Sequence, residues 1–530
     1  MERKSSLGSG PSFQLQSKLA PSVTLSRLGW LLIVAACCIF SFLVWRGRYT
    51  NVEMCRDFVP IYAGSRCLLH GCSPYDPSAL YREFVSAGGT GFNPRLWTNG
   101  VAVYPPTTFL VTLPLAPLTI GAMDWIWISL VLFSVCGTAL LMADLAADFT
   151  LLPAAIPIAS LLCASTVVGK LGQPAAIEIG ILGASMWLVL RRKWPWLTAS
   201  LLGIGFVFKP QLALALALWM FLQPGYCRRV VLRACTVAIV IISLTLVVYA
   251  ARPATRTWFP QLMSSLAVVQ QPHHHDSNGN ETKLFNSNFI GPENPDTQSM
   301  TDVQVVAAIW SLRWANFIAA AVFLPLLAVW GWAWWRAPKT HEAALIALAC
   351  LCPMTLLPIY HRQYDAILLL LCMPAVSVLW MHGKRWGISA VAVASLTALL
   401  IWDRYLNLLA NHVHTNSHLV LATVLRSPVW ACLFLTIFLL AALVSFRPSS
   451  QVCPGLLTDR TKIFSPNQGL ASVADAGTGC AWVDVCADGC CAPVAPTAIA
   501  SLCFPVGAGD GRSSACVTWL TTEGLSRSLT

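Results

Sequence analysis

The chain has 530 residues, of which 56% are hydrophobic and only 11% are charged, whereas a soluble domain averages about a quarter charged residues. A water-soluble globule is therefore excluded, and lipid must be the solvent for most of the chain. The 34 Lys and Arg exceed the 23 Asp and Glu by a net charge of +11, but the basic residues form short runs between apolar segments. That distribution indicates membrane topology and argues against nucleic-acid binding.

The first apolar run is Leu28 to Trp45, and residues 1–27 before it are basic. No small-residue cleavage site follows the run, so it is predicted to be an uncleaved first helix behind a cytoplasmic N-terminal segment. Residues 46–124 then form a large first outer loop. Within it the stretch Pro105 to Gly121 carries four prolines and is predicted to be a short helix or re-entrant piece at the outer surface.

Further apolar segments bring the prediction to an all-α polytopic membrane protein with about 12 transmembrane helices within residues 28–446. The segments lie near 125–147, 151–168, 174–190, 195–208, 210–222, 230–251, 307–335, 343–358, 364–381, 386–402 and 428–446. Each crossing changes sides, and with this count the basic runs all fall on the cytoplasmic side. These runs contain Arg191, Arg228, Arg336, Lys384 and Arg447.

Two segments lack a membrane pattern. Residues 252–306 form a second outer loop with a run of three histidines, His273 to His275, which we expect to be an exposed polar segment and not a metal site. Residues 449–530 are rich in Gly, Ala, Ser, Thr and Cys without a helical or alternating period, which predicts a low-complexity, mostly disordered cytoplasmic tail. The tail cysteines lack the paired spacing of a zinc site.

The 20 cysteines mostly lie in apolar segments, where they act as small hydrophobic residues. The first outer loop holds Cys55, Cys67 and Cys72. One disulfide among them is predicted if the loop lies in an oxidising compartment, and the spacing leaves the pairing open.

Polar and ionisable residues gather at the outer ends of several connections. Ionisable groups are costly at membrane depth, so they are functional hypotheses by default. The set comprises Asp57, Lys170, Gln173, Lys209, Gln211, His361, Arg362 and Asp365. One carboxylate near several cations suits transfer from a phosphate-linked donor, with the carboxylate as base and the cations stabilising the leaving phosphate. The alternative is that each charge reaches independently toward interfacial water.

Five sequence elements occur in order along the chain and together resemble family-87 glycosyltransferases. They are Asp57 to Gly64, Leu68 to Asp76, Tyr104-Pro105-Pro106 followed by Pro114 to Leu118, Gly172-Gln173-Pro174, and Lys209-Pro210-Gln211. The resemblance covers about residues 28–446. Pro174 departs from the family, which usually has Asn after Gly-Gln.

The resemblance implies a type-C glycosyltransferase fold and a polyprenol-phosphate-mannose-dependent mannosyltransferase that inverts configuration. Its donor would be a polyprenyl-phosphate sugar and its acceptor a glycolipid or glycan. The active site would lie on the non-cytoplasmic side of a plasma membrane, which the resemblance implies to be the bacterial inner membrane. No cofactor and no metal are expected. The family places the catalytic base at Asp57. The substrate-binding residues are predicted to be Tyr62, Tyr75, Asp76, Tyr104, Gln173, Lys209, Gln211, His361, Tyr364 and Asp365.

His361 is the first candidate for the donor phosphate and Lys209 the second. The choice of His361 rests on its place beside Tyr364 and Asp365 at an outer helix start, where a carboxylate can orient it. A transporter or lipid flippase is the alternative function, because about a dozen crossings with short broken helices also fit a carrier. The absence of two similar halves in the sequence favours the enzyme. A structural partner in envelope assembly is a third interpretation.

Overall fold

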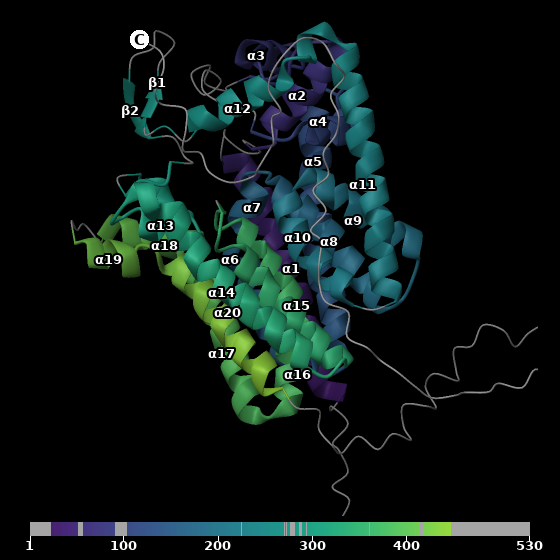
Figure 1. Ribbon diagram of the computed structural model, residues 1–530, viewed down its shortest axis with the longest axis vertical. Helices are drawn as coiled ribbons and strands as arrows, with labels where there is room; N and C mark the ends of the chain where they lie inside the picture. Colours follow the sequence, from purple (N-terminus) through teal and green to yellow (C-terminus); the bar gives the residue numbers. More distant parts are fainter. Residues whose placement is uncertain are drawn as a thin grey trace, which may run out of the picture. The chain divides into compact units, whose positions relative to one another are not determined.

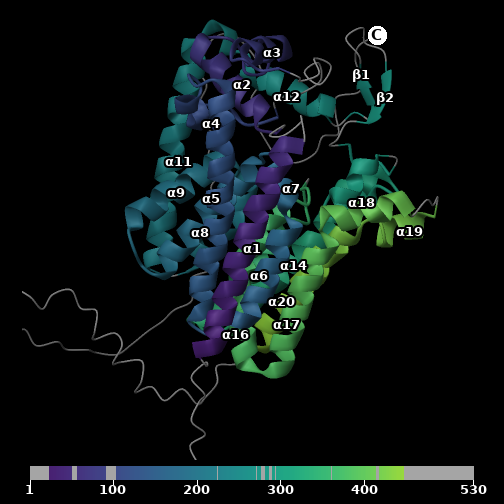
Figure 2. The same ribbon diagram turned by 180° about the vertical axis from the view of Figure 1, so that it is seen from behind.

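The computed structural model describes residues 23–50, 57–90, 103–223, 225–269, 271, 273–275, 281–285, 289–292, 294–359, 361–412 and 417–446. These residues form a bundle of helices with smaller elements gathered at one end (Figures 1 and 2). The predicted tail at 449–530, most of the N-terminal segment 1–27, and Cys55 lie outside the described residues.

The described residues are helical apart from one antiparallel pair of short strands. The α-helices are α1 (Val23–Thr50), α2 (Val59–His70), α3 (Pro77–Ser86), α4 (Pro106–Thr112), α5 (Ile120–Ala147), α6 (Leu151–Ala164), α7 (Thr166–Lys170), α8 (Pro174–Leu190), α9 (Pro195–Phe208), α10 (Pro210–Leu222), α11 (Tyr226–Ala251), α12 (Trp258–Val269), α13 (Gln304–Ala307), α14 (Ala315–Arg336), α15 (His341–Thr355), α16 (Met373–His382), α17 (Lys384–Leu400), α18 (Asp403–His412), α19 (His418–Thr423) and α20 (Ser427–Ser445). The 3-10 helices are η2 (Leu113–Leu115), η3 (Pro253–Thr255), η4 (Pro295–Ser299), η5 (Leu312–Trp314) and η6 (Asp365–Cys372), and the strands are β1 (His273–His275) and β2 (Glu281–Phe285).

One end of the bundle collects the basic runs, and we call it the basic end. Its contacts are Arg191 with Asp148 (2.9 Å), Phe149 with His341 (ring centroids 6.1 Å), Ser377 Oγ with the Thr150 carbonyl (2.6 Å) and His382 with Phe446 (ring centroids 4.3 Å). These contacts join six helices, several of which are distant in sequence. They bring Arg191 to the same end as His341 and His382, which lie close in sequence to Arg336 and Lys384, as the positive-inside bias predicts.

The opposite end, the loop end, holds both predicted outer loops. Its contacts are the Asp57 amide with the Leu171 carbonyl (3.1 Å), Thr107 Oγ1 with the Val207 carbonyl (2.6 Å), the Thr301 amide with the His361 carbonyl (2.9 Å) and Ser73 Oγ with Gln261 Oε1 (2.6 Å). The helices α1, α5, α6, α8, α9, α10, α11, α14, α15, η6 with α16, α17 and α20 therefore run alternately between the two ends. This is the order predicted from hydropathy.

Six helical segments of the described residues are long and apolar enough to cross a membrane by length and composition. They are Thr24–Gly47, Ile120–Ala147, Tyr226–Ala251, Leu312–Arg336, Asp365–His382 and Ser427–Ser445. The passes α6, α8, α9, α10 and α15 are apolar but shorter. The six candidate spans indicate a helical protein that crosses the membrane several times. The count of about 12 crossings and the type-C fold stay predictions.

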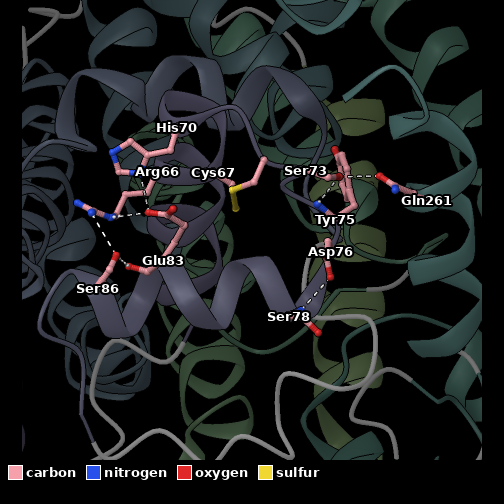
Figure 3. The surroundings of a disulfide bond; sticks show 11 residues. Arg66, Cys67, His70, Ser73, Tyr75, Asp76, Ser78, Glu83, Ser86 and Gln261 are labelled. Atoms are coloured by element: carbon pink, nitrogen blue, oxygen red, sulfur yellow. Dashed lines mark hydrogen bonds and ion pairs between the residues drawn. A yellow bond between two sulfur atoms is a disulfide. The ribbon is translucent and has the colours of Figure 1, made fainter. Parts of the chain in front are cut away.

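The first outer loop folds into α2, α3 and α4 at the loop end. α4 is the short helix expected between Pro105 and Gly121, and its Phe109 is fully buried. A Cβ on Gly64 would lie 2.4 Å from the Phe109 ring, so a glycine is needed for α2 and α4 to approach. Cys67 is bonded to Cys72 where α2 ends, which decides the pairing that the sequence left open (Figure 3).

Candidate functional site

A break between two passes positions the first cation of the site. α9 ends at Phe208 and α10 begins at Pro210, so Lys209 stands between two short helices. Pro210 has no amide hydrogen to continue α9 and restricts the residue before it, which is why the chain breaks here. Lys209 has extended backbone (φ −146°, ψ 74°) and its side chain leaves the helix pair toward the start of η6.

Two segments distant in sequence position the second basic group. The chain before α13 runs antiparallel to the chain after α15, and main-chain hydrogen bonds join them. These bonds run from Val303 N to Leu357 O (2.8 Å), from Thr301 N to His361 O (2.9 Å) and from Gln363 N to Ser299 O (2.7 Å). The ladder fixes His361 one helical turn before Asp365.

Lys209, His361 and Asp365 form a buried charged cluster. Lys209 Nζ donates to Asp365 Oδ1, and His361 Nδ1 lies 3.0 Å from Asp365 Oδ2. The side chains of the three residues are 14%, 0% and 3% exposed in the order Lys209, His361, Asp365. Lys209 Nζ also lies 5.6 Å from the centroid of the Tyr364 ring, within the range of a cation–π contact. Four residues of the predicted site are thus brought together.

The Nε2 nitrogen of His361 is the group of the cluster that can bind a ligand. Its Nε2 is buried and has no hydrogen-bond partner among the described residues. Asp365 holds the other ring nitrogen, so the ring orientation is set by a carboxylate while Nε2 stays available to a ligand. A buried, unsatisfied ring nitrogen costs stability unless a ligand or water meets it.

Asp57 is anchored in a neighbouring corner of the loop end. Its amide donates to the Leu171 carbonyl (3.1 Å), and its carbonyl accepts from the Tyr104 hydroxyl (3.2 Å). The next residue, Phe58, stacks on Trp127 with ring centroids 4.3 Å apart. Asp57 therefore lies directly beside the turn that carries the Gly-Gln element, and Tyr104 lies next to it as predicted.

α4 connects this corner to the charged cluster. Tyr104 comes just before α4, and two hydroxyls of that helix bond to the last carbonyls of α9. Thr107 Oγ1 donates to Val207 (2.6 Å) and Thr108 Oγ1 donates to Phe208 (3.3 Å). Since Lys209 follows Phe208 directly, Asp57 and Lys209 are joined through a single short helix.

The matching family model is described as glycosyltransferase family 87 and covers residues 102–358. Residues 102–358 belong to glycosyltransferase family 87. The resemblance drawn from sequence motifs is confirmed for this region, and together with the six candidate spans it supports a membrane glycosyltransferase over the transporter alternative. The matched region includes Lys209 and ends just before His361. No curated protein and no solved structure gives a significant match to the chain.

Three of the residues expected to bind substrate make contacts within the first outer loop. Tyr62 is buried and its hydroxyl donates to the Leu118 carbonyl. Tyr75 is buried and its hydroxyl donates to the Tyr104 carbonyl (2.8 Å), and Asp76 caps α3 by accepting from the Ser78 amide (3.0 Å). These hydrogen bonds fix where the three side chains lie, and their role in substrate binding stays a prediction.

The other two predicted residues lie at helix starts near the site. Gln173 is buried at the N-terminus of α8, and Gln211 is half-buried in the first turn of α10. In the part of the chain that is described, no three His, Cys, Asp or Glu side chains gather as metal ligands would.

Sequence reasoning missed two acidic residues beside the cluster. Asp302 is fully buried and accepts from the amides of His361 (3.4 Å) and Val305 (3.3 Å), and burial raises its pKa to about 7. Glu178 is fully buried in α8, and a Cβ on Gly205 would lie 2.7 Å from Glu178 Oε1. Glu178 could have been predicted to be functional, because it is an acidic residue inside the apolar segment 174–190. Asp302 stood in a loop without any pattern.

Proposed function

We propose that the protein transfers a hexose, mannose by its family resemblance, from a polyprenyl-phosphate donor to a glycolipid or glycan acceptor. The observation that carries this proposal is the buried cluster in which Asp365 binds both Lys209 and His361 while His361 Nε2 remains without a partner among the described residues. Such a cluster offers cationic donors in a site shielded from water, where they act most strongly on an anionic group.

The donor phosphate is bound by His361 and Lys209. His361 donates Nε2–H to a phosphate oxygen while its Nδ1 stays hydrogen-bonded to Asp365. The Lys209 ammonium group contacts the same phosphate while it keeps its ion pair with Asp365. Both groups stabilise the negative charge that develops on phosphate as the bond to the sugar breaks, so no separate acid is needed for this leaving group.

Asp57 acts on the acceptor. Its carboxylate takes the proton from an acceptor hydroxyl, and the oxygen attacks the anomeric carbon from the face opposite the phosphate. The bond from the anomeric carbon to the phosphate oxygen breaks, and its electron pair stays with the phosphate. Configuration at the anomeric carbon inverts in this single displacement.

The loop end faces away from the cytoplasm in this proposal. The basic runs lie at the opposite end of the bundle, and the Cys67–Cys72 disulfide at the loop end requires an oxidising compartment. Together with the family resemblance, these observations support a plasma membrane location, in a bacterium the inner membrane.

The deciding experiment compares sugar donors. Membranes that contain the protein are incubated with labelled polyprenyl-phosphate mannose or with the corresponding nucleotide sugar, and transfer to lipid and glycan fractions is measured. Label should come only from the polyprenyl-phosphate sugar. Transfer from the nucleotide sugar alone would refute the proposed donor.

Two substitutions test the proposed roles in the same assay. Asp57→Asn should lower the rate by roughly 10²–10⁴-fold with donor binding retained. His361→Ala should weaken donor use more than acceptor use. Asp148→Asn is the matched control, because it makes the same change to a carboxylate at the basic end, outside the predicted site. Transfer by Asp57→Asn within a few-fold of the parent would make Asp57 structural and shift attention to Asp365 or Asp76 as the base.

A further inference from the structure

An apolar groove lies between α17 and α20, which run side by side in both views of the bundle (Figures 1 and 2). Its volume is about 530 Å³, and its lining includes Val393, Leu396, Trp430, Phe434 and Ile437. A second hollow of about 400 Å³ shares Trp430 with it and reaches Ser427. From Ile437 to Ser427 the groove follows α20 for roughly 15 Å, toward the loop end.

Two buried donors without partners stand where the groove reaches the loop end. Arg426 is 3% exposed, and its Nη2 donates to Thr297 Oγ1. Arg426 Nε and Ser427 Oγ have no hydrogen-bond partner among the described residues. Burial lowers the pKa of Arg426 to about 10, so the guanidinium remains charged at neutral pH. A buried charged donor of this kind needs an anionic or polar acceptor.

The same corner adjoins the proposed donor site. Thr297, which accepts from Arg426, lies in η4 just before the ladder that holds His361. In that ladder Ser299 pairs with Gln363 and Thr301 pairs with His361. Asp302, which accepts from the His361 amide, lies close enough to Arg426 to interact with its charge. Arg426 therefore stands between Ser427 at the end of the groove and the loop segment that holds His361.

We propose that the groove between α17 and α20 binds the isoprenoid tail of the donor, with Arg426 and Ser427 contacting the phosphate end of that tail. This inference rests on the proposed function and specifies where the lipid part of its donor is held. The groove is apolar along its length and has its unpartnered donors at one end. That distribution matches an amphiphile with one anionic head and one long apolar tail.

The test uses the dependence of transfer on the length of the donor tail. Decaprenyl-phosphate mannose has a tail that fills the groove, and geranyl-phosphate mannose has one too short to do so. Ile437→Trp places a larger side chain into the groove from α20, roughly 15 Å from Ser427 along the helix. Val444→Trp is the matched control, because Val444 is similarly exposed on the same helix (48% against 49% for Ile437) but does not line the groove.

Ile437→Trp should raise KM for the decaprenyl donor about tenfold, which corresponds to the loss of roughly two buried methylene groups. It should leave KM for the geranyl donor unchanged, because that tail is too short to reach Ile437, and Val444→Trp should change neither value. Ser427→Ala should raise KM for both donors, because it removes a contact at the phosphate end. Equal effects of Ile437→Trp on both donors, or equal effects of both Trp variants, would overturn the groove assignment.

A photoreactive decaprenyl-phosphate provides a second readout that does not depend on catalysis. Its label should appear in α17 and α20 and should be displaced by unlabelled decaprenyl phosphate. Displacement by an ordinary phospholipid at the same concentration would assign the groove to bilayer lipid and overturn the proposal. If neither mannose donor supports transfer by the parent protein, the proposed function fails, whereas transfer without any effect of tail length refutes only the groove.

Discussion

Asp365→Asn tests whether the charged cluster is a buried network. The Asp365 side chain is 3% exposed and that of Lys209 is 14%, so the pair belongs with buried ion pairs and not with surface pairs. Removing one partner of a buried pair costs about 3–5 kcal/mol, because the remaining charge is left without compensation. We expect the low end of that range, about 3 kcal/mol, since Lys209 can still reach some water.

The loss should appear as a fall in melting temperature of roughly 3–4 °C, measured in detergent by tryptophan fluorescence. The double substitution Lys209→Met with Asp365→Asn removes both charges and should recover most of the stability but none of the sugar transfer. Asp148→Asn is the control at the basic end: the Asp148 side chain is 41% exposed in its pair with Arg191, so its loss should cost about 1 kcal/mol or less.

A shift as small as that of Asp148→Asn would refute this reasoning, because it would show that the Asp365 carboxylate is hydrated. Failure of the double substitution to regain stability would also contradict it, since the cost would then come from packing and not from charge.

Three further predictions concern the loop end and the topology. The raised pKa of Asp302 favours its protonated form in the folded state, so stability should fall as pH rises from about 4 to about 7. Asp302→Asn should reduce this dependence of the melting temperature on pH, and an unchanged dependence would contradict the prediction. Cys67 and Cys72 of protein isolated without reductant should resist alkylation until reduction, and labelling before reduction would rule out their disulfide. Lys193→Cys should react with an impermeant maleimide only from the cytoplasmic face, and labelling from the outer face would reverse the proposed orientation.

Much of the helical arrangement could be predicted from sequence, because apolar runs and their basic flanks report membrane passes directly. The break at Lys209-Pro210 and the short proline-rich helix α4 followed from the chemistry of proline. The partnership of His361 with Asp365 was readable as a spacing of one helical turn.

Other parts of the site depend on contacts that a sequence pattern does not encode. Asp302 and Arg426 join the site through an antiparallel ladder between two loop segments without hydrophobic period. The carbonyl partners of the Tyr62 and Tyr75 hydroxyls could not be predicted from the sequence either, because a tyrosine suits packing and ligand contact equally well.

The 3-10 geometry of η6 has a consequence for the length of its pass. The pass consists of the 8 residues of η6 and the 10 residues of α16, and it is the shortest of the six candidate spans. As a regular α-helix it would measure ~27 Å, slightly less than the ~30 Å hydrocarbon thickness. The larger rise of ~2.0 Å per residue in a 3-10 helix adds ~4 Å and brings the pass to ~31 Å. Tightening of one helical segment thus carries Asp365 to the bilayer surface without an added residue.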